Sequence, residues 1–174
     1  IEPSRGLGDV YKRQIVMPMT WDDWPEIARN IFQLMRSEAG EEIVLEKNIF
    51  VERILFNDSE KGLSDEVKKE YIRPFKNAGE DRRPTLTWPR QIPIDGSPEA
   101  VIDEVTKNGE FHKNSDIPKL FINADPGTIL IGKQREFVRS WSNLKEVTVK
   151  GNHFVQEDSP HEIGEALKVF IETI

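Results

Sequence analysis

Two residues able to perform acid–base chemistry follow short apolar segments near the end of the chain. His153 follows the alternating segment 147–150 in a Gly-x-His turn, and Asp125 follows the apolar run 118–123 within Asn-Ala-Asp-Pro-Gly. Residues that follow neighbouring parallel strands meet at one edge of a sheet, where α/β proteins bind their ligands. An imidazole oriented by a carboxylate can serve as a general base, so the pair predicts proton-transfer chemistry.

On position alone, simpler interpretations of these residues stay open. His153 also fits a surface loop, and Asp-Pro-Gly is ordinary turn chemistry for Asp125. We expect the other two histidines to lie at the surface. His112 stands in a polar stretch, and His161 falls in the first turn of the last helix, where a cation opposes the helix dipole.

No other pattern in these residues supplies a reactive group. The sequence contains no Gly-x-Ser-x-Gly or Gly-x-Asp-x-Gly elbow, no histidine–carboxylate cluster with metal spacing and no phosphate-binding loop. Cysteine is absent, which excludes disulfides, thiolate metal sites and cysteine nucleophiles. The residues therefore imply no metal and no cofactor, and the partner nucleophile of an acid–histidine pair is missing from them.

The last third of the chain predicts a β-α-β-α unit. Strands are expected at 118–123 and 147–150, with a helix around 137–141 between them. Ser159-Pro160-His161-Glu162 fits a capping box that opens a final helix. The fold class is therefore α/β. Two parallel strands do not make a stable sheet alone, so we expect the chain to pair with something else or to be the C-terminal part of a larger α/β protein.

The preceding part of the chain predicts helices. Asp23-Trp24-Pro25-Glu26 fits a capping box ahead of an apolar helical stripe that reaches Met35. A second helix is expected over 43–55, a third from Ser64 to Phe75, and a fourth from Ser97. The proline-rich stretch 84–93 predicts an ordered extended linker.

Composition limits the classes of partner and compartment. The 174 residues include 24 Lys and Arg against 31 Asp and Glu, and the net charge of −7 argues against a nucleic-acid partner. No apolar run approaches the ~18 residues of a membrane span, and no signal-peptide core is visible, so we expect a cytoplasmic protein. Residues 1–14 show no helical or strand period and are predicted to be disordered or foreign.

Three long motifs resemble haloalkane dehalogenase, a member of the α/β-hydrolase superfamily. They are RPTLTWPRQIPI at 83–94, IPKLFINA at 117–124 and GNHFVQEDSP at 151–160, with NIFVE at 48–52 in agreement. The likeness runs from about Ile15 to the C-terminus. It implies a helical cap over residues 15–96, followed by the C-terminal part of an α/β-hydrolase core over 97–174.

The resemblance also implies a reaction and the residues that take part in it. An aspartate displaces halide from a small apolar haloalkane, and a histidine then activates the water that hydrolyses the resulting alkyl-enzyme ester. His153 matches that histidine. The positions that match the substrate-binding wall are Phe32, Phe50, Pro89, Ile92, Thr128, Ile129 and Phe154. Without the resemblance, ordinary core packing would explain all seven.

The sequence departs from the family at several positions. The nucleophile and the halide-binding residues beside it lie upstream of the motifs found here. The orienting glutamate of the resembled subfamily falls on Arg13, and Asp125 occupies the place where other α/β-hydrolases keep this acid. Polar residues fill the loop 56–62, where an apolar tunnel mouth is expected. We therefore expect a C-terminal fragment that is inactive alone, with Asp125 as candidate orienting acid.

Two other interpretations stay open at this point. Epoxide hydrolases share the aspartate–histidine mechanism but use cap tyrosines, and only Tyr11 and Tyr71 occur here. The chain could also be a non-catalytic truncated product that serves as a binding or assembly module. The sequence assigns no oligomeric state.

Overall fold

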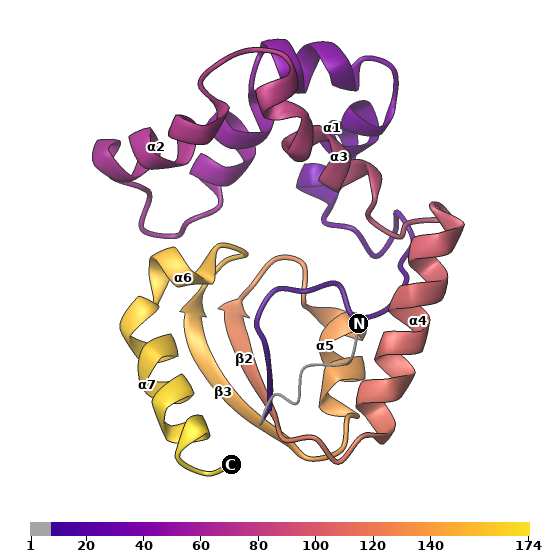
Figure 1. Cartoon of the computed structure of the whole chain (residues 1–174), viewed down its shortest axis with the longest axis vertical. Coiled ribbons are helices and arrows are strands. Elements are labelled where there is room, and N and C mark those ends of the chain that lie inside the picture. Colours follow the sequence, from indigo (N-terminus) through magenta and orange to yellow (C-terminus); the bar gives the residue numbers. More distant parts are fainter. Residues whose placement is uncertain (1–7) are drawn as a thin grey trace. The chain divides into compact units, whose positions relative to one another are not determined.

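The computed structural model describes residues 8–174 and divides into two compact units. One unit is Pro18–Glu104, and the other combines Ile1–Met17 with Val105–Ile174. Figure 1 shows that the first is helical and that the second contains the sheet. Within the described residues, no helix is long and apolar enough to cross a membrane.

The sheet unit contains three parallel strands, in the order β1 (Asp9–Tyr11), β2 (Lys119–Pro126) and β3 (Leu144–Gly151). Helix α5 (Gly132–Arg139) connects β2 to β3. The short helix α6 (Val155–Asp158) and helix α7 (Pro160–Ile171) follow β3. In Figure 1, α7 covers one face of the sheet, while α5 and the second half of α4 (Glu99–Asn114) cover the other. Both faces of the central strand β2 are thus buried over residues 119–123, as is typical of parallel sheets.

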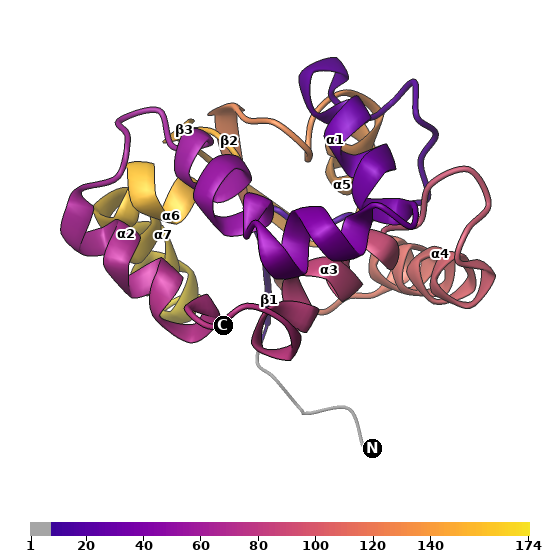
Figure 2. The same cartoon turned by 90° about the horizontal axis from the view of Figure 1, so that it is seen from above.

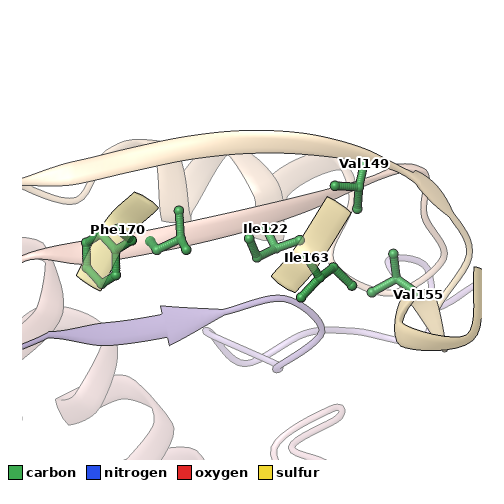
Figure 3. Close-up of a cluster of buried hydrophobic side chains, with 6 residues drawn as sticks. Ile122, Val149, Val155, Ile163 and Phe170 are labelled. Atoms are coloured by element: carbon green, nitrogen blue, oxygen red, sulfur yellow. The ribbon is translucent and has the colours of Figure 1, made fainter. Parts of the chain in front are cut away.

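Alternate residues of β2 supply the two hydrophobic layers. Leu120 and Ile122 pack with Val149, Val155 and α7 residues that include Ile163 and Phe170, as Figure 3 shows for most of this cluster. Phe121 points to the opposite face, where it packs with Val16, Leu130, Val138 and Trp141. The period of two places one apolar set on each side of the strand.

Buried polar side chains hold the main chain around this sheet. The ammonium of Lys119 is buried and donates to the carbonyl oxygens of Ser115, Ile117 and Ser142 at 2.7–2.9 Å. The side chain of Gln134 accepts from the N–H groups of Val16 and Met17 and donates to the Met17 carbonyl. Each buried polar group is therefore used to fix a loop or a connecting segment.

The helical unit consists of short elements joined by tight turns (Figure 2). In chain order they are α1 (Glu26–Arg36), the π-helical segments η1 (Glu41–Glu46) and η2 (Phe50–Leu55), α2 (Asp65–Ile72), the 3₁₀ turns η3 (Arg73–Phe75) and η4 (Glu80–Arg82), α3 (Arg83–Arg90) and the start of α4. Short helices leave many terminal carbonyls without intrahelical partners.

Three arginines take up these carbonyl groups. Arg82 is 8 % exposed and donates to the carbonyls of Phe75, Leu45, Glu46 and Lys76. Arg36 donates to the carbonyls of Pro89, Ile92 and Ser97, and Arg90 donates to those of Met35 and Ser37. The guanidinium fork thus joins elements that are distant in sequence.

The prediction of an extended linker at 84–93 is wrong, because residues 83–90 form helix α3. Pro84 occupies the first turn, where the missing N–H costs nothing, and Pro89 stands in the last turn. The second predicted helix is interrupted at Asn48, whose φ of 53° separates η1 from η2. Such a left-handed residue cannot continue a right-handed helix.

Both predicted capping boxes differ from the structure, while the predicted cap of α2 by Ser64 is confirmed. The carboxylate of Asp23 accepts from Thr20, and α1 begins at Glu26 without a side-chain cap. The hydroxyl of Ser159 donates to the Lys150 carbonyl in place of capping α7. Asp23 thus bonds within the turn before α1, and Ser159 bonds to the end of the preceding strand.

A third strand, β1, was not predicted. Residues 9–11 were expected to be disordered within the stretch 1–14, but they pair with β2 from Lys119 to Phe121. Tyr11 packs edge-on against Trp141, which accounts for the order of this segment. Residues 1–7 lie outside the described residues.

We expect Arg82→Ala to destabilise the helical unit by about 2–5 kcal/mol, because four carbonyl groups lose the guanidinium as a donor and a cavity opens. Hydrogen–deuterium exchange of the amides of Glu41–Glu46 measures the effect locally. Arg73→Ala is the matched control, because the exposed guanidinium of Arg73 bonds to the exposed carboxylate of Glu70. Equal exchange rates in the two variants would contradict the role assigned to Arg82.

Candidate active site

His153 lies where the sequence places it, in the turn between the carboxyl end of β3 and α6. Gly151 ends the strand with a φ of 149°, and the chain then passes through Asn152 and His153 to Phe154. The imidazole is half-buried and stands edge-on to the Phe154 ring, with 5.2 Å between ring centroids. Within residues 8–174, the Phe154 ring is its aromatic neighbour, and no hydrogen bond engages either ring nitrogen.

Burial and a nearby cation keep this imidazole neutral. The loss of hydration lowers the pKa of His153 to about 4, and the positive charge of Arg13 acts in the same direction. The guanidinium of Arg13 lies 5.0 Å from the centroid of the Phe154 ring, which places it beside the histidine turn. At neutral pH the ring is therefore a proton acceptor, the protonation state that a general base requires.

Asp125 occupies the same edge of the sheet but does not contact His153. It pairs in register with Lys150, and the following Pro126 pairs with Gly151. Its side chain is exposed, and within residues 8–174 no hydrogen bond joins it to the imidazole. The structure thus brings the two strand ends together, while the orienting role of Asp125 stays a prediction.

Three of the expected substrate-binding residues belong to the sheet unit. Ile129 and Phe154 are buried and Thr128 is half-buried, and all three lie in the turns that follow β2 and β3. These turns lie at the carboxyl edge of the sheet, the position at which α/β folds bind ligands.

The other four expected residues belong to the helical unit. Phe32 is buried and its ring lies 4.7 Å from that of Trp24, while the half-buried Phe50 stands edge-on to Trp88 at 5.8 Å. The carbonyls of Pro89 and Ile92 both accept from Arg36. In the helical unit, aromatic contacts therefore hold Phe32 and Phe50, and Arg36 holds the backbone at Pro89 and Ile92.

Sequence reasoning did not single out Trp24, Trp88 or Arg36. The side chain of Trp88 is 46 % exposed, and the buried indole nitrogen of Trp24 has no partner in the described residues. Trp88 lies inside the motif at 83–94, so the sequence did offer a signal that could have drawn attention to this tryptophan. The role of Arg36 depends on carbonyl groups more than 50 positions away and left no local pattern.

The other histidines and possible metal ligands do not form a second centre. His161 is exposed, as expected. The prediction that His112 is solvated is wrong, because α4 continues to Asn114 and packs the ring against Trp141, where it bonds the Tyr11 hydroxyl at 2.7 Å. Burial lowers the pKa of His112, against the opposing charge of Asp9. Among the described residues, no group of three or more His, Cys, Asp or Glu could hold a metal ion.

Comparison with known proteins identifies the relatives of this chain, although no family model matches it. The haloalkane dehalogenase of Mycolicibacterium smegmatis is 50 % identical over 173 residues, which cover 98 % of this chain and 55 % of the relative. That of Sphingobium indicum is 49 % identical, over 97 % of this chain and 57 % of the relative. This chain is homologous to haloalkane dehalogenases.

The homology accounts for the fold and leaves the reaction to be tested. The haloalkane dehalogenase DbeA from Bradyrhizobium elkani superposes with a TM-score of 0.90 at 31 % identity, over 96 % of this chain and 59 % of DbeA. The family resemblance and the α/β-hydrolase fold class, with this chain as its C-terminal part, are thereby confirmed. The chain spans just over half the length of its dehalogenase relatives.

One relative carries a different activity. A coelenterazine h 2-monooxygenase from Renilla reniformis is 42 % identical over 157 residues, 89 % of this chain and 50 % of the relative. Homology over this part of the fold is therefore compatible with more than one chemistry.

We expect Arg13→Glu to raise the pKa of His153, because it replaces a charge that disfavours the imidazolium with one that stabilises it. Arg13→Gln should give a smaller rise. An NMR titration of the His153 ring protons measures both. Lys12→Glu makes the same change of charge one residue away and serves as control. A pKa that stays near 4 in Arg13→Glu would show that the cation does not act on the ring.

Proposed function

We propose that this chain provides the helical cap and the C-terminal core of an enzyme that hydrolyses carbon–halogen bonds. The observation that carries the proposal is a neutral, half-buried imidazole at the carboxyl end of β3, in a chain about half identical to haloalkane dehalogenases. The helical unit Pro18–Glu104 serves as the cap in this proposal.

The proposed reaction has two steps that balance without a cofactor. A carboxylate oxygen attacks the carbon that bears the halogen, and halide leaves with the electrons of the broken bond. His153 then takes a proton from water, whose oxygen attacks the ester carbonyl, and alcohol leaves. The products are alcohol, halide and a proton, and the attacking carboxylate is regenerated.

Each unit has a part in this proposal. His153 supplies the base, and Ile129, Thr128 and Phe154 supply apolar surface beside it. Phe32, Phe50, Pro89 and Ile92 are the residues of the helical unit that match substrate-binding positions for a small haloalkane. Apolar walls favour such a substrate and keep bulk water from the ester until a single water is activated.

The 174 residues contain no nucleophile elbow, so we expect the purified chain to release no halide from 1-bromobutane above the buffer rate. Halide release is measured with a bromide-selective electrode, and His153→Ala is the control. Turnover that His153→Ala abolishes would contradict this expectation, because it would require an attacking group within these residues.

A chimera tests the reaction itself. Residues 15–174 replace the matching part of the Mycolicibacterium relative, and 1-bromobutane and coelenterazine are offered in parallel. We expect halide release from the chimera. In His153→Ala we expect a single equivalent of halide and an alkylated protein visible by mass spectrometry, because the ester forms and is not hydrolysed.

Two outcomes would overturn the proposed function. Oxygenation of coelenterazine without halide release would favour the monooxygenase chemistry of the Renilla relative. Unchanged turnover in the His153→Ala chimera would show that this imidazole is not the base. Asn152→Ala, a change of the neighbouring side chain, controls for disturbance of the turn.

A further inference from the structure

The turn that carries His153 lies between two anchored residues. Val149, before the turn, and Val155, after it, belong to the same buried cluster (Figure 3). None of the five residues between them belongs to this cluster, so its packing fixes the ends of the turn and not the direction of the imidazole. The backbone between these anchors needs its own restraints.

Two buried side chains supply restraints to this turn. Asp158 is 1 % exposed, and its Oδ2 accepts the backbone N–H of Asn152 at 3.1 Å. Ser159 is 3 % exposed, and its hydroxyl donates to the carbonyl of Lys150 at 2.6 Å. The two bonds hold the main chain immediately before and immediately after Gly151.

Gly151 lets the carboxylate approach this closely. A Cβ at this position would lie 2.8 Å from both Cβ and Oδ2 of Asp158, nearer than carbon and oxygen atoms pack. The φ of 149° is also one that residues with side chains rarely adopt. The strand therefore ends against the Asp158 side chain, two residues before His153.

The placement of Ser159 and Asp158 differs from ordinary helix capping. Ser159 precedes α7 but makes no side-chain cap to that helix, and its hydroxyl reaches back to the end of β3. A carboxylate buried as deeply as that of Asp158 is costly unless its hydrogen bonds are specific. Both residues thus use a buried polar group to hydrogen-bond the main chain of the histidine turn.

We propose that Asp158 and Ser159 are positioning residues, which hold the backbone on either side of Gly151 and thereby fix the direction of the His153 imidazole. The inference rests on the proposed function, because it assumes that the imidazole is the working group. Neither residue touches the ring. They act through the main chain, because their hydrogen bonds hold the two residues that flank Gly151.

The test measures the His153 ring in the chain as it exists. Asp158→Ala removes the acceptor for Asn152, so the turn loosens and the ring gains hydration. The pKa of His153 should then rise by about one unit or more from about 4, because burial is the largest cause of its low value. Loss of the negative charge alone would change the pKa in the opposite direction. The sign therefore separates positioning from electrostatics.

Three further variants make the result interpretable. Asp158→Asn keeps an oxygen that can accept from Asn152 and should not raise the pKa. Ser159→Ala should raise it by less than Asp158→Ala, and it decides the question if Asp158→Ala does not fold. Ser142→Ala removes bonds to the Lys113 and Ser115 carbonyls ahead of the opposite end of β3, and it should leave the pKa unchanged.

An NMR titration reports the pKa, and the amide spectrum of β2 and β3 reports whether the sheet unit is folded. A fall or no change of the pKa in folded Asp158→Ala would overturn the proposal. An equal rise in Ser142→Ala would also overturn it, since general loosening would then suffice. A chimera without dehalogenase activity would refute the proposed function and leave this titration as an independent result.

Discussion

Strand β3 ends at Gly151, where any Cβ would lie 2.8 Å from the buried side chain of Asp158. A residue with a side chain would not fit at position 151 unless Asp158, the last residue of α6, were displaced. The chain turns at once, and His153 emerges beside Phe154 at the carboxyl edge of the sheet. The chemistry available to the protein depends on this steric limit, because the imidazole has no hydrogen-bonding partner of its own in residues 8–174.

The same physical solution recurs across both units. Where helices and strands end, carbonyl groups lose their regular partners, and long or polar side chains from distant segments take them up. Lys119 does this ahead of β2 and Ser159 does it at the end of β3, while Arg82 and Arg36 do it among the short helices. A unit of short, irregular elements is thereby held together by cations that point inward. The apolar residues expected at the substrate site stand on segments fixed in this way.

The sequence allowed prediction of those features that local patterns encode. The strands at 118–123 and 147–150, and the turn that carries His153, follow from alternation and from glycine. Helix α3 was missed because two prolines suggested an extended chain, although both stand where a helix tolerates them. The roles of Asp158 and Ser159 were missed because a serine before a helix resembles a cap. Only the tertiary structure shows that its hydroxyl bonds to the previous strand.

The basicity of His153 places a further constraint on any working form of this scaffold. A base whose pKa is about 4 is always unprotonated near neutral pH, but it gains little from accepting a proton. The imidazolium formed during catalysis would also lie near the Arg13 cation. A carboxylate close to the ring reverses both effects, since it stabilises the imidazolium and orients the neutral ring. Asp125 stands at the correct edge of the sheet but is exposed and out of contact, whereas position 13 already acts on the ring electrostatically. Burial is the larger cause of the low basicity of His153 and the Arg13 cation is the smaller one, and a carboxylate at position 13 would oppose both.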